Sequence, residues 1–131
     1  MTFERVDIGA LQLNVNAAAQ APLAEGLLSF QFLDTIRRLF DDTIDHFIVT
    51  FTLKQRKSTI HMYRQSLTVR VESPDGGEAR EIPVSYSILS QPVRDDADSK
   101  RRNFLTSLFS EAEKQMETQQ CQVMVKKKGK R

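Results

Sequence analysis

Residues 66–89 read SLTVRVESPDGGEAREIPVSYSIL and carry the clearest fold signal in the chain. In both halves every second residue is apolar, first at Leu67, Val69 and Val71 and then at Ile82, Val84, Tyr86 and Ile88. A period of two is typical of β-strands with one buried face, and the intervening SPDGGE has the composition of a chain reversal. The pattern therefore predicts a β-hairpin. Pro83 has no N–H for a neighbouring strand, so we expect either that the second strand lies at a sheet edge or that Pro83 occupies a position whose N–H would face outward.

The neighbouring segments extend this pattern in both directions. HFIVTFTLK (46–54) alternates in the same way and predicts a further strand, and KQRKSTIHMYR (54–64) is expected to be a loop or the frayed ends of two strands. Apolar residues at three- and four-residue spacing predict helices over about 23–42 and 98–118. Residues 3–15 alternate roughly and predict an extended arm.

These elements predict an α+β fold in the order helix, three-stranded antiparallel sheet, helix (αβββα). Both helices are expected to cover one face of the sheet and to leave the other face open. The expected domain spans residues 27–118, between an N-terminal extension (1–26) and a basic tail (119–131) that we expect to be mobile. The chain's 131 residues suffice for one hydrophobic core.

The charged residues are unevenly distributed along the chain, although the net charge is only +2. Two acid-free stretches hold ten basic residues, which are Lys54, Arg56, Lys57, Arg64 and Arg70, followed by Lys126, Lys127, Lys128, Lys130 and Arg131. The rest of the chain carries nine basic residues against 17 acids, a net charge of −8. Two local basic patches on an acidic body favour a polyanionic partner, and the hydroxyls and Tyr63 in the first patch suit contact with nucleic acid.

The sequence offers little for catalysis, and we expect a binding module that is not an enzyme and needs no cofactor. No phosphate-binding glycine loop, nucleophile elbow or zinc-binding HExxH motif is present. Cys121 is the only cysteine, and His46 and His61 are the only histidines, which disfavours a metal centre. Acidic and basic residues at positions 4–7 interrupt any signal peptide, and no apolar run is long enough to cross a bilayer. A cytoplasmic location is therefore expected, with no membrane insertion.

LLSFQFLDTIRRLFDDTIDHFIVTFTLKQRK (27–57) resembles the opening of the 14 kDa subunit of the signal recognition particle. That family begins with a leucine pair, a QFL…RLF helix and a strand ending near TLK. The later segments LTVRVESPDGGEAREIPVSY (67–86), NFLTSLFSEAEKQM (103–116) and KKKGKR (126–131) are similar to its second hairpin, closing helix and basic tail. The family's αβββα fold agrees with the order of elements predicted above.

The resemblance implies a function in co-translational targeting to the endoplasmic reticulum. Members of this family pair with a similar 9 kDa subunit, bind the Alu portion of the particle RNA and delay elongation on the ribosome. The implied RNA-binding residues are Lys54, Arg56, Lys57, Arg64, Arg70, Lys126, Lys127, Lys128, Lys130 and Arg131. Alternation along 66–72 directs Arg70 away from the helices.

Two alternatives remain open at the level of sequence. The chain could be a protein-interaction adaptor or chaperone-like α+β domain whose basic tail only improves solubility. A three-stranded sheet covered on one face also leaves apolar edges, which suit a heterodimer but equally allow a homodimer.

Overall fold

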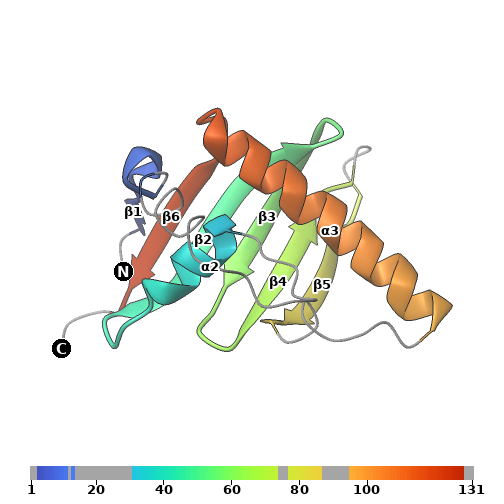
Figure 1. Ribbon diagram of the computed structural model, residues 1–131, viewed down its shortest axis with the longest axis horizontal. Helices are drawn as coiled ribbons and strands as arrows, with labels where there is room; N and C mark the ends of the chain where they lie inside the picture. The colour runs from blue at the N-terminus through green and yellow to red at the C-terminus, as the bar shows by residue number, and fades with distance from the viewer. Residues whose placement is uncertain (1–2, 12, 14–30, 74–76, 87–94, 129–131) are drawn as a thin grey trace.

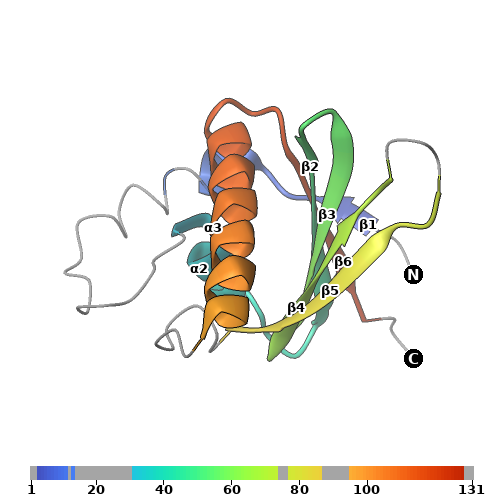
Figure 2. The same ribbon diagram turned by 90° about the vertical axis from the view of Figure 1, so that its right-hand side faces the viewer.

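The computed structural model of the protein describes residues 3–11, 13, 31–73, 77–86 and 95–128 (Figure 1). These residues form one antiparallel sheet of six strands that is covered on one face by helices. The strand order is β1-β6-β2-β3-β4-β5. The strands are β1 (Phe3–Arg5), β2 (Ile44–Leu53), β3 (Arg56–Met62), β4 (Ser66–Val71), β5 (Arg80–Ser85) and β6 (Gln122–Lys127). The helices α2 (Gln31–Arg38) and α3 (Asp96–Glu117) lie on the same side of the sheet, and residues 8–11 add a short helical segment (Figure 2).

The predicted αβββα fold is wrong, because the sheet has six strands instead of three. Segment 54–64, expected as a loop, contains β3, whose inward positions Ser58, Ile60 and Met62 are fully buried. Its basic first residues and its single inward serine weaken the hydrophobic alternation, so the strand is hard to recognise from sequence.

The two ends of the described chain supply the other additional strands. Residues 122–127, expected within a mobile basic tail, form β6 between β1 and β2, and residues 3–5 of the expected arm form β1 at the sheet edge. β6 belongs to the sheet because Val123 and Val125 alternate into the core despite the adjacent lysines. Hydrophobic burial of two valines therefore determines the conformation of a segment whose composition suggests a solvated tail.

The predicted strands and second helix otherwise lie where the sequence places them. β2, β4 and β5 correspond to 46–54, 66–72 and 80–89, and α3 corresponds to 98–118, although residues 87–89 lie outside the described part. β5 forms an edge of the sheet, which confirms the expectation from Pro83. α2 ends at Arg38, earlier than predicted, and residues 23–30 of the predicted helix lie outside the described residues.

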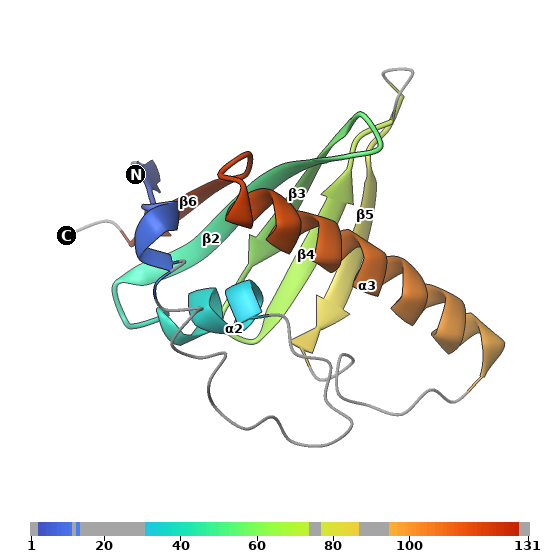
Figure 3. The same cartoon turned by 45° about the horizontal axis from the view of Figure 1, so that its top comes forward.

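The hydrophobic core lies between the helices and the covered face of the sheet. α3 crosses the strands diagonally, so it contacts the sheet from the β2 end to the β5 end (Figure 3). Side chains that are less than 1% exposed come from both layers, namely Ile36, Val49, Ile60, Met62, Leu67, Val69, Leu108, Phe109, Met116 and Val123. Among the described residues, no helix lies on the opposite face of the sheet (Figure 2).

Gln115 fixes the C-terminal half of α3 against the end of β2. Pairing between β2 and β6 ends at Thr50 and Gln122, which leaves the backbone of Thr52 without a strand partner on that side. The side-chain amide of Gln115 replaces that partner, accepting a hydrogen bond from the Thr52 N–H and donating one to the Thr52 carbonyl. This contact places α3 beside the β2–β3 turn.

Candidate nucleic-acid interface

The open face of the sheet carries the side chains that alternate away from the core. Register places Phe3 opposite Lys126 and Lys126 opposite His46, so three strands contribute one continuous row at one end of this face. The next row contains Arg5, Met124, Ile48 and His61. Thr50 and Thr59 then pair farther along the face. We call this surface, opposite the helices, the open face.

Four aromatic rings and one lysine form a cluster on the open face. The His46 ring stacks on Tyr63 at 5.1 Å between centroids with 28° between planes, and it lies 5.9 Å from the His61 ring. Phe3 meets His46 edge-on at 6.1 Å, and Lys126 Nζ lies 5.7 Å from the Phe3 ring centroid. We define Phe3, His46, His61, Tyr63 and Lys126 as the aromatic cluster.

The outer rings of the cluster remain accessible to a ligand. Phe3 is 46% exposed and Tyr63 is 40% exposed, whereas His46 between them is only 8% exposed. The buried imidazole of His46 therefore contacts both exposed rings, stacking on Tyr63 and meeting Phe3 edge-on. Large exposed aromatic rings on a sheet surface provide flat areas on which nucleic-acid bases can stack.

Both histidines of the cluster are uncharged at neutral pH. Burial lowers the pKa of His46 below its ordinary value, against a smaller opposing effect of Asp45, whose Oδ2 lies 3.8 Å from His46 Nδ1. Burial likewise lowers the pKa of His61, against the opposing charge of Glu81. Within the described residues, His46 Nδ1 has no hydrogen-bond partner. The two rings therefore act as neutral aromatic surfaces, and Lys126 supplies the positive charge.

Lys57, Arg70 and Lys126 are the predicted RNA-binding residues that lie on the open face. Lys57 pairs with Thr52 of β2, and Arg70 pairs with Thr59 of β3. Arg70 points away from the helices, as its alternation with buried Leu67, Val69 and Val71 predicts, and its Nη1 lies 3.3 Å from Glu81 Oε1. That carboxylate offsets the charge of Arg70, so Lys57 and Lys126 contribute more to the positive potential.

Two other predicted residues, Arg64 and Lys127, form ion pairs. Arg64, in the β3–β4 turn, lies 3.7 Å from Asp42, and Lys127 alternates to the helix side, where its Nζ lies 3.1 Å from Glu4. The backbone N–H of Lys128 donates to the carbonyl of Thr43 at 2.8 Å. Lys130 and Arg131 lie outside the described residues. Arg64 and Lys127 are therefore each paired with a carboxylate, whereas Lys57 and Lys126 have no carboxylate partner within the described residues.

Lys54 and Arg56 separate from Lys57 although all three are close in sequence. Lys54 and Gln55 adopt positive φ angles of 49° and 66°, the geometry of a tight two-residue hairpin turn. Arg56 lies on the same face of β3 as the buried residues Ser58 and Ile60. Arg56 and Lys54 both line a cavity beside α3, on the helix side of the sheet. The first basic patch of the sequence is thus divided between the two faces of the sheet.

The sequence gives no local signal for Phe3, His46 and Arg5 as interface residues. Phe3 and Arg5 lie at one end of the chain and reach Lys126 and Met124 only because β1 pairs with β6. His46 has no catalytic partner nearby in the sequence, and it joins the cluster through rings that belong to other strands. Only the strand register reveals that these side chains are neighbours.

The remaining candidate chemistry of the described chain is limited. Burial raises the pKa of the Cys121 thiol to about 12, so the basic residues that follow it do not activate it. Among the described residues, no three histidine, cysteine or acidic side chains gather in a metal-binding group. None of the helices in that part of the chain is long and apolar enough to cross a membrane.

The open face therefore combines stacked aromatic rings, β-branched polar residues and two lysines without a carboxylate partner within the described chain. Comparison of the chain with protein-family models, curated proteins and solved structures finds no match.

Proposed function

We propose that the chain is a cytoplasmic, non-enzymatic RNA-binding protein that holds structured RNA on the open face of its sheet. The aromatic cluster carries this proposal, because its exposed Phe3 ring lies beside Lys126, its exposed Tyr63 ring stacks on His46, and partial burial keeps both histidines neutral. Exposed rings stack unpaired bases, and lysines contact the phosphates on either side.

The geometry of the open face suits a single-stranded loop or bulge better than a continuous duplex. Phe3 of β1 and Tyr63, the residue that follows β3, both contact His46, and β6 and β2 lie between β1 and β3. Two splayed bases can stack there while Lys126, between them, and Lys57, farther along the face, contact phosphates. Thr50, Thr59 and Thr68 add hydroxyl groups that can donate to or accept from RNA.

The RNA of the signal recognition particle is the first target to test. The likeness of residues 27–57 to the 14 kDa subunit supports it, whereas the six-stranded sheet departs from that family's αβββα fold. The corresponding partner would be a similar 9 kDa subunit in a complex that engages the ribosome. The edge strands β1 and β5 are where such a subunit could extend the sheet.

Replacing both Lys57 and Lys126 with glutamine is expected to weaken RNA binding about tenfold at moderate salt. Loss of two phosphate contacts should also reduce the slope of log affinity against log salt by about 1.4 to 1.8. The measurement is fluorescence anisotropy with the Alu portion of the particle RNA and with an unrelated structured RNA of equal length. Preference for the Alu RNA would support the particle assignment specifically.

Arg56→Gln is the matched control for this experiment. It removes one positive charge next to Lys57 in the same strand, but from the opposite side of the sheet. We expect Arg56→Gln to retain nearly the wild-type RNA affinity. An equal loss in Arg56→Gln and in the single variant Lys57→Gln would mean that RNA responds only to total charge, and it would contradict binding through the open face.

A protein-interaction surface is the second candidate function. Ile48 and Met124 lie side by side near the middle of the open face and are only partly buried. Apolar side chains in such a position favour contact with a protein. If no structured RNA binds at low salt and purified partners still bind after nuclease treatment, the open face serves this function.

A further inference from the structure

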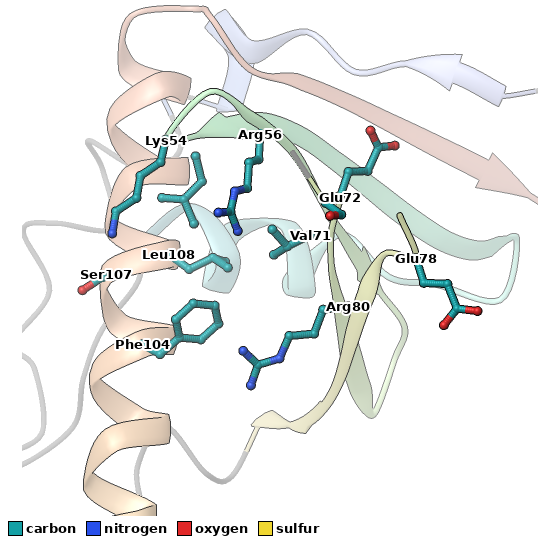
Figure 4. A pocket seen from close by; sticks show the side chains of 11 residues that line it. Lys54, Arg56, Val71, Glu72, Glu78, Arg80, Phe104, Ser107 and Leu108 are labelled. Carbon is teal, nitrogen blue, oxygen red and sulfur yellow. The ribbon is translucent and has the colours of Figure 1, made fainter. Parts of the chain in front are cut away.

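A cavity of about 370 Å³ lies on the helix side of the sheet, away from the open face (Figure 4). It is bounded by α3, by the β2–β3 turn and by the ends of β4 and β5. Leu53, Val71, Phe104 and Leu108 give it an apolar lining, and Leu108 is fully buried. Its volume is in the range of pockets that hold small organic ligands.

Three basic side chains from two hairpins surround this apolar lining. Lys54 lies in the β2–β3 turn, Arg56 follows the turn as the first residue of β3, and Arg80 begins β5. The guanidinium carbon of Arg80 lies 5.5 Å from the Phe104 ring centroid, so this cation packs over the Phe104 ring. Figure 4 shows the guanidinium groups of Arg56 and Arg80 directed toward the space beside α3.

The positive charge in the cavity is poorly compensated. Within the described part of the chain, no carboxylate forms an ion pair with Lys54, Arg56 or Arg80. Glu72 and Glu78 belong to the rim, and their carboxylates point away from the cavity in Figure 4. Three cations beside low-dielectric walls produce a local positive potential that attracts an anion.

The backbone of the β2–β3 turn holds two of the cations in place. Lys54 and Gln55 both have positive φ, a conformation that costs non-glycine residues free energy. The turn is held by β2–β3 pairing up to Leu53 and Arg56, and by the contact of Gln115 with Thr52. The cationic side of the cavity is therefore built on a fixed element.

We propose that this cavity binds a small phosphate monoester that carries an aromatic or apolar group. A phosphate monoester bears a charge near −2 at neutral pH, which matches three cations better than a single carboxylate does. Arginine guanidinium groups bind phosphate oxygens bidentately. Phe104 and Leu108 receive the apolar group.

Isothermal titration calorimetry with phenyl phosphate tests the proposal on the intact chain. We expect binding with a Kd below about 1 mM. Inorganic phosphate should bind at least about tenfold more weakly because it leaves the apolar lining unoccupied. Phenol should show no measurable binding because it lacks the anion. Failure of phenyl phosphate to bind at 10 mM, or equal affinity for inorganic phosphate, would overturn the proposal.

Arg56→Gln and Lys57→Gln provide a matched pair for locating the site. Arg56→Gln is expected to weaken phenyl phosphate binding at least about tenfold, whereas Lys57→Gln should leave it unchanged. Equal effects would overturn the cavity site. Under the proposed function, RNA binding shows the opposite pattern, because Lys57→Gln weakens it and Arg56→Gln does not. Failure of one proposal is therefore distinguishable from failure of the other.

A spectrum of the wild-type protein keeps the test valid if Arg56→Gln fails to fold. Phenyl phosphate should shift the amide resonances of Phe104 and Ser107 in a ¹⁵N–¹H correlation spectrum and leave those of Thr50 and Met124 in place. Shifts confined to open-face residues would contradict the proposal.

Discussion

Val123→Asp is expected to reduce the free energy of unfolding by at least about 4 kcal/mol, enough to unfold much of the protein at 25 °C. Val123 is fully buried in β6, directly opposite Val49 of β2, and its carbonyl accepts a hydrogen bond of 2.8 Å from Val6. An aspartate there would lose the apolar contacts and place a carboxylate in the core. Urea unfolding followed by circular dichroism measures the change.

Gln122→Asp is the control for this substitution. It introduces the same charge one residue earlier in β6, at an exposed position of the strand. The expected loss is below about 1 kcal/mol, the range of strand preferences at exposed sites. If Val123→Asp also costs less than about 1 kcal/mol, residues 122–127 do not form a strand in the sheet and the six-stranded fold is wrong.

Glu113→Gln is expected to remove a pH-dependent loss of stability. Burial raises the pKa of the Glu113 carboxyl to about 7 despite the hydrogen bond of 3.1 Å that its Oε1 accepts from the Phe32 N–H. In the unfolded chain this carboxyl has its ordinary pKa of 4.5, so stability contributed by protonated Glu113 is lost as pH rises from about 4.5 to about 7. Glutamine keeps an acceptor for Phe32 without a charge.

At pH 8 the Glu113→Gln variant should be more stable than the wild type by on the order of 1–2 kcal/mol, after allowance for solvent screening of a partly exposed group. Near pH 4.5 the difference should shrink toward zero. Burial lowers the pKa of His46 and His61, so both favour the folded state less at acidic pH, but they are common to both proteins and cancel in the difference.

Glu78→Gln serves as the control for the pH experiment because it neutralises a carboxylate on an exposed residue. Its unfolding free energy should follow the wild-type pH dependence. A constant difference between Glu113→Gln and the wild type from pH 4.5 to 8 would show that Glu113 does not titrate differently in the folded state. Urea unfolding at each pH provides the measurement.

The strands with the most regular alternation were predictable from sequence. β4 and β5 share the 66–89 segment with a polar turn, and each inward position along β4 is apolar, so local pattern and global burial agree. α3 follows from an apolar stripe in which Leu105, Leu108 and Phe109 are all buried. Pro83 correctly indicated an edge strand.

β3 and β6 could not be predicted from local pattern, because each has two adjacent basic residues at one end and few apolar residues at its inward positions. β6 is six residues long and its inward positions are Val123, Val125 and the rim residue Lys127, so only two buried side chains carry the alternation. β3 directs Arg56 to the same side as Ser58 and Ile60. In both strands the pairing with β2 stabilises a conformation that local preference barely favours.

The candidate interface was predictable only in part. Alternation in β4 correctly directed Arg70 to the open face, but it could not show that Glu81 would lie across from it on β5. Lys54, Arg56 and Lys57 are close in sequence, which suggested that they act together. Because successive side chains of a strand alternate between its faces, Arg56 and Lys57 lie on opposite faces of the sheet. The aromatic cluster depends on the register of four strands, which local sequence does not encode.

The open face and the cavity assign different roles to the basic residues of one hairpin. Lys57 belongs to the RNA-binding proposal, and Arg56 belongs to the phosphate-monoester proposal. A pair of neighbouring substitutions therefore separates the two surfaces. Under the two proposals, the two ligands would not compete for the same side chains of this acid-free stretch.

Methyl NMR of ¹³C-labelled methionine during titration with structured RNA tests RNA binding on the open face most directly. Met124 lies on that face opposite Ile48, whereas Met62 and Met116 are fully buried on the helix side. RNA is predicted to shift or broaden the Met124 methyl resonance and to leave those of Met62 and Met116 unchanged. An unchanged Met124 resonance at saturating RNA would contradict binding on the open face.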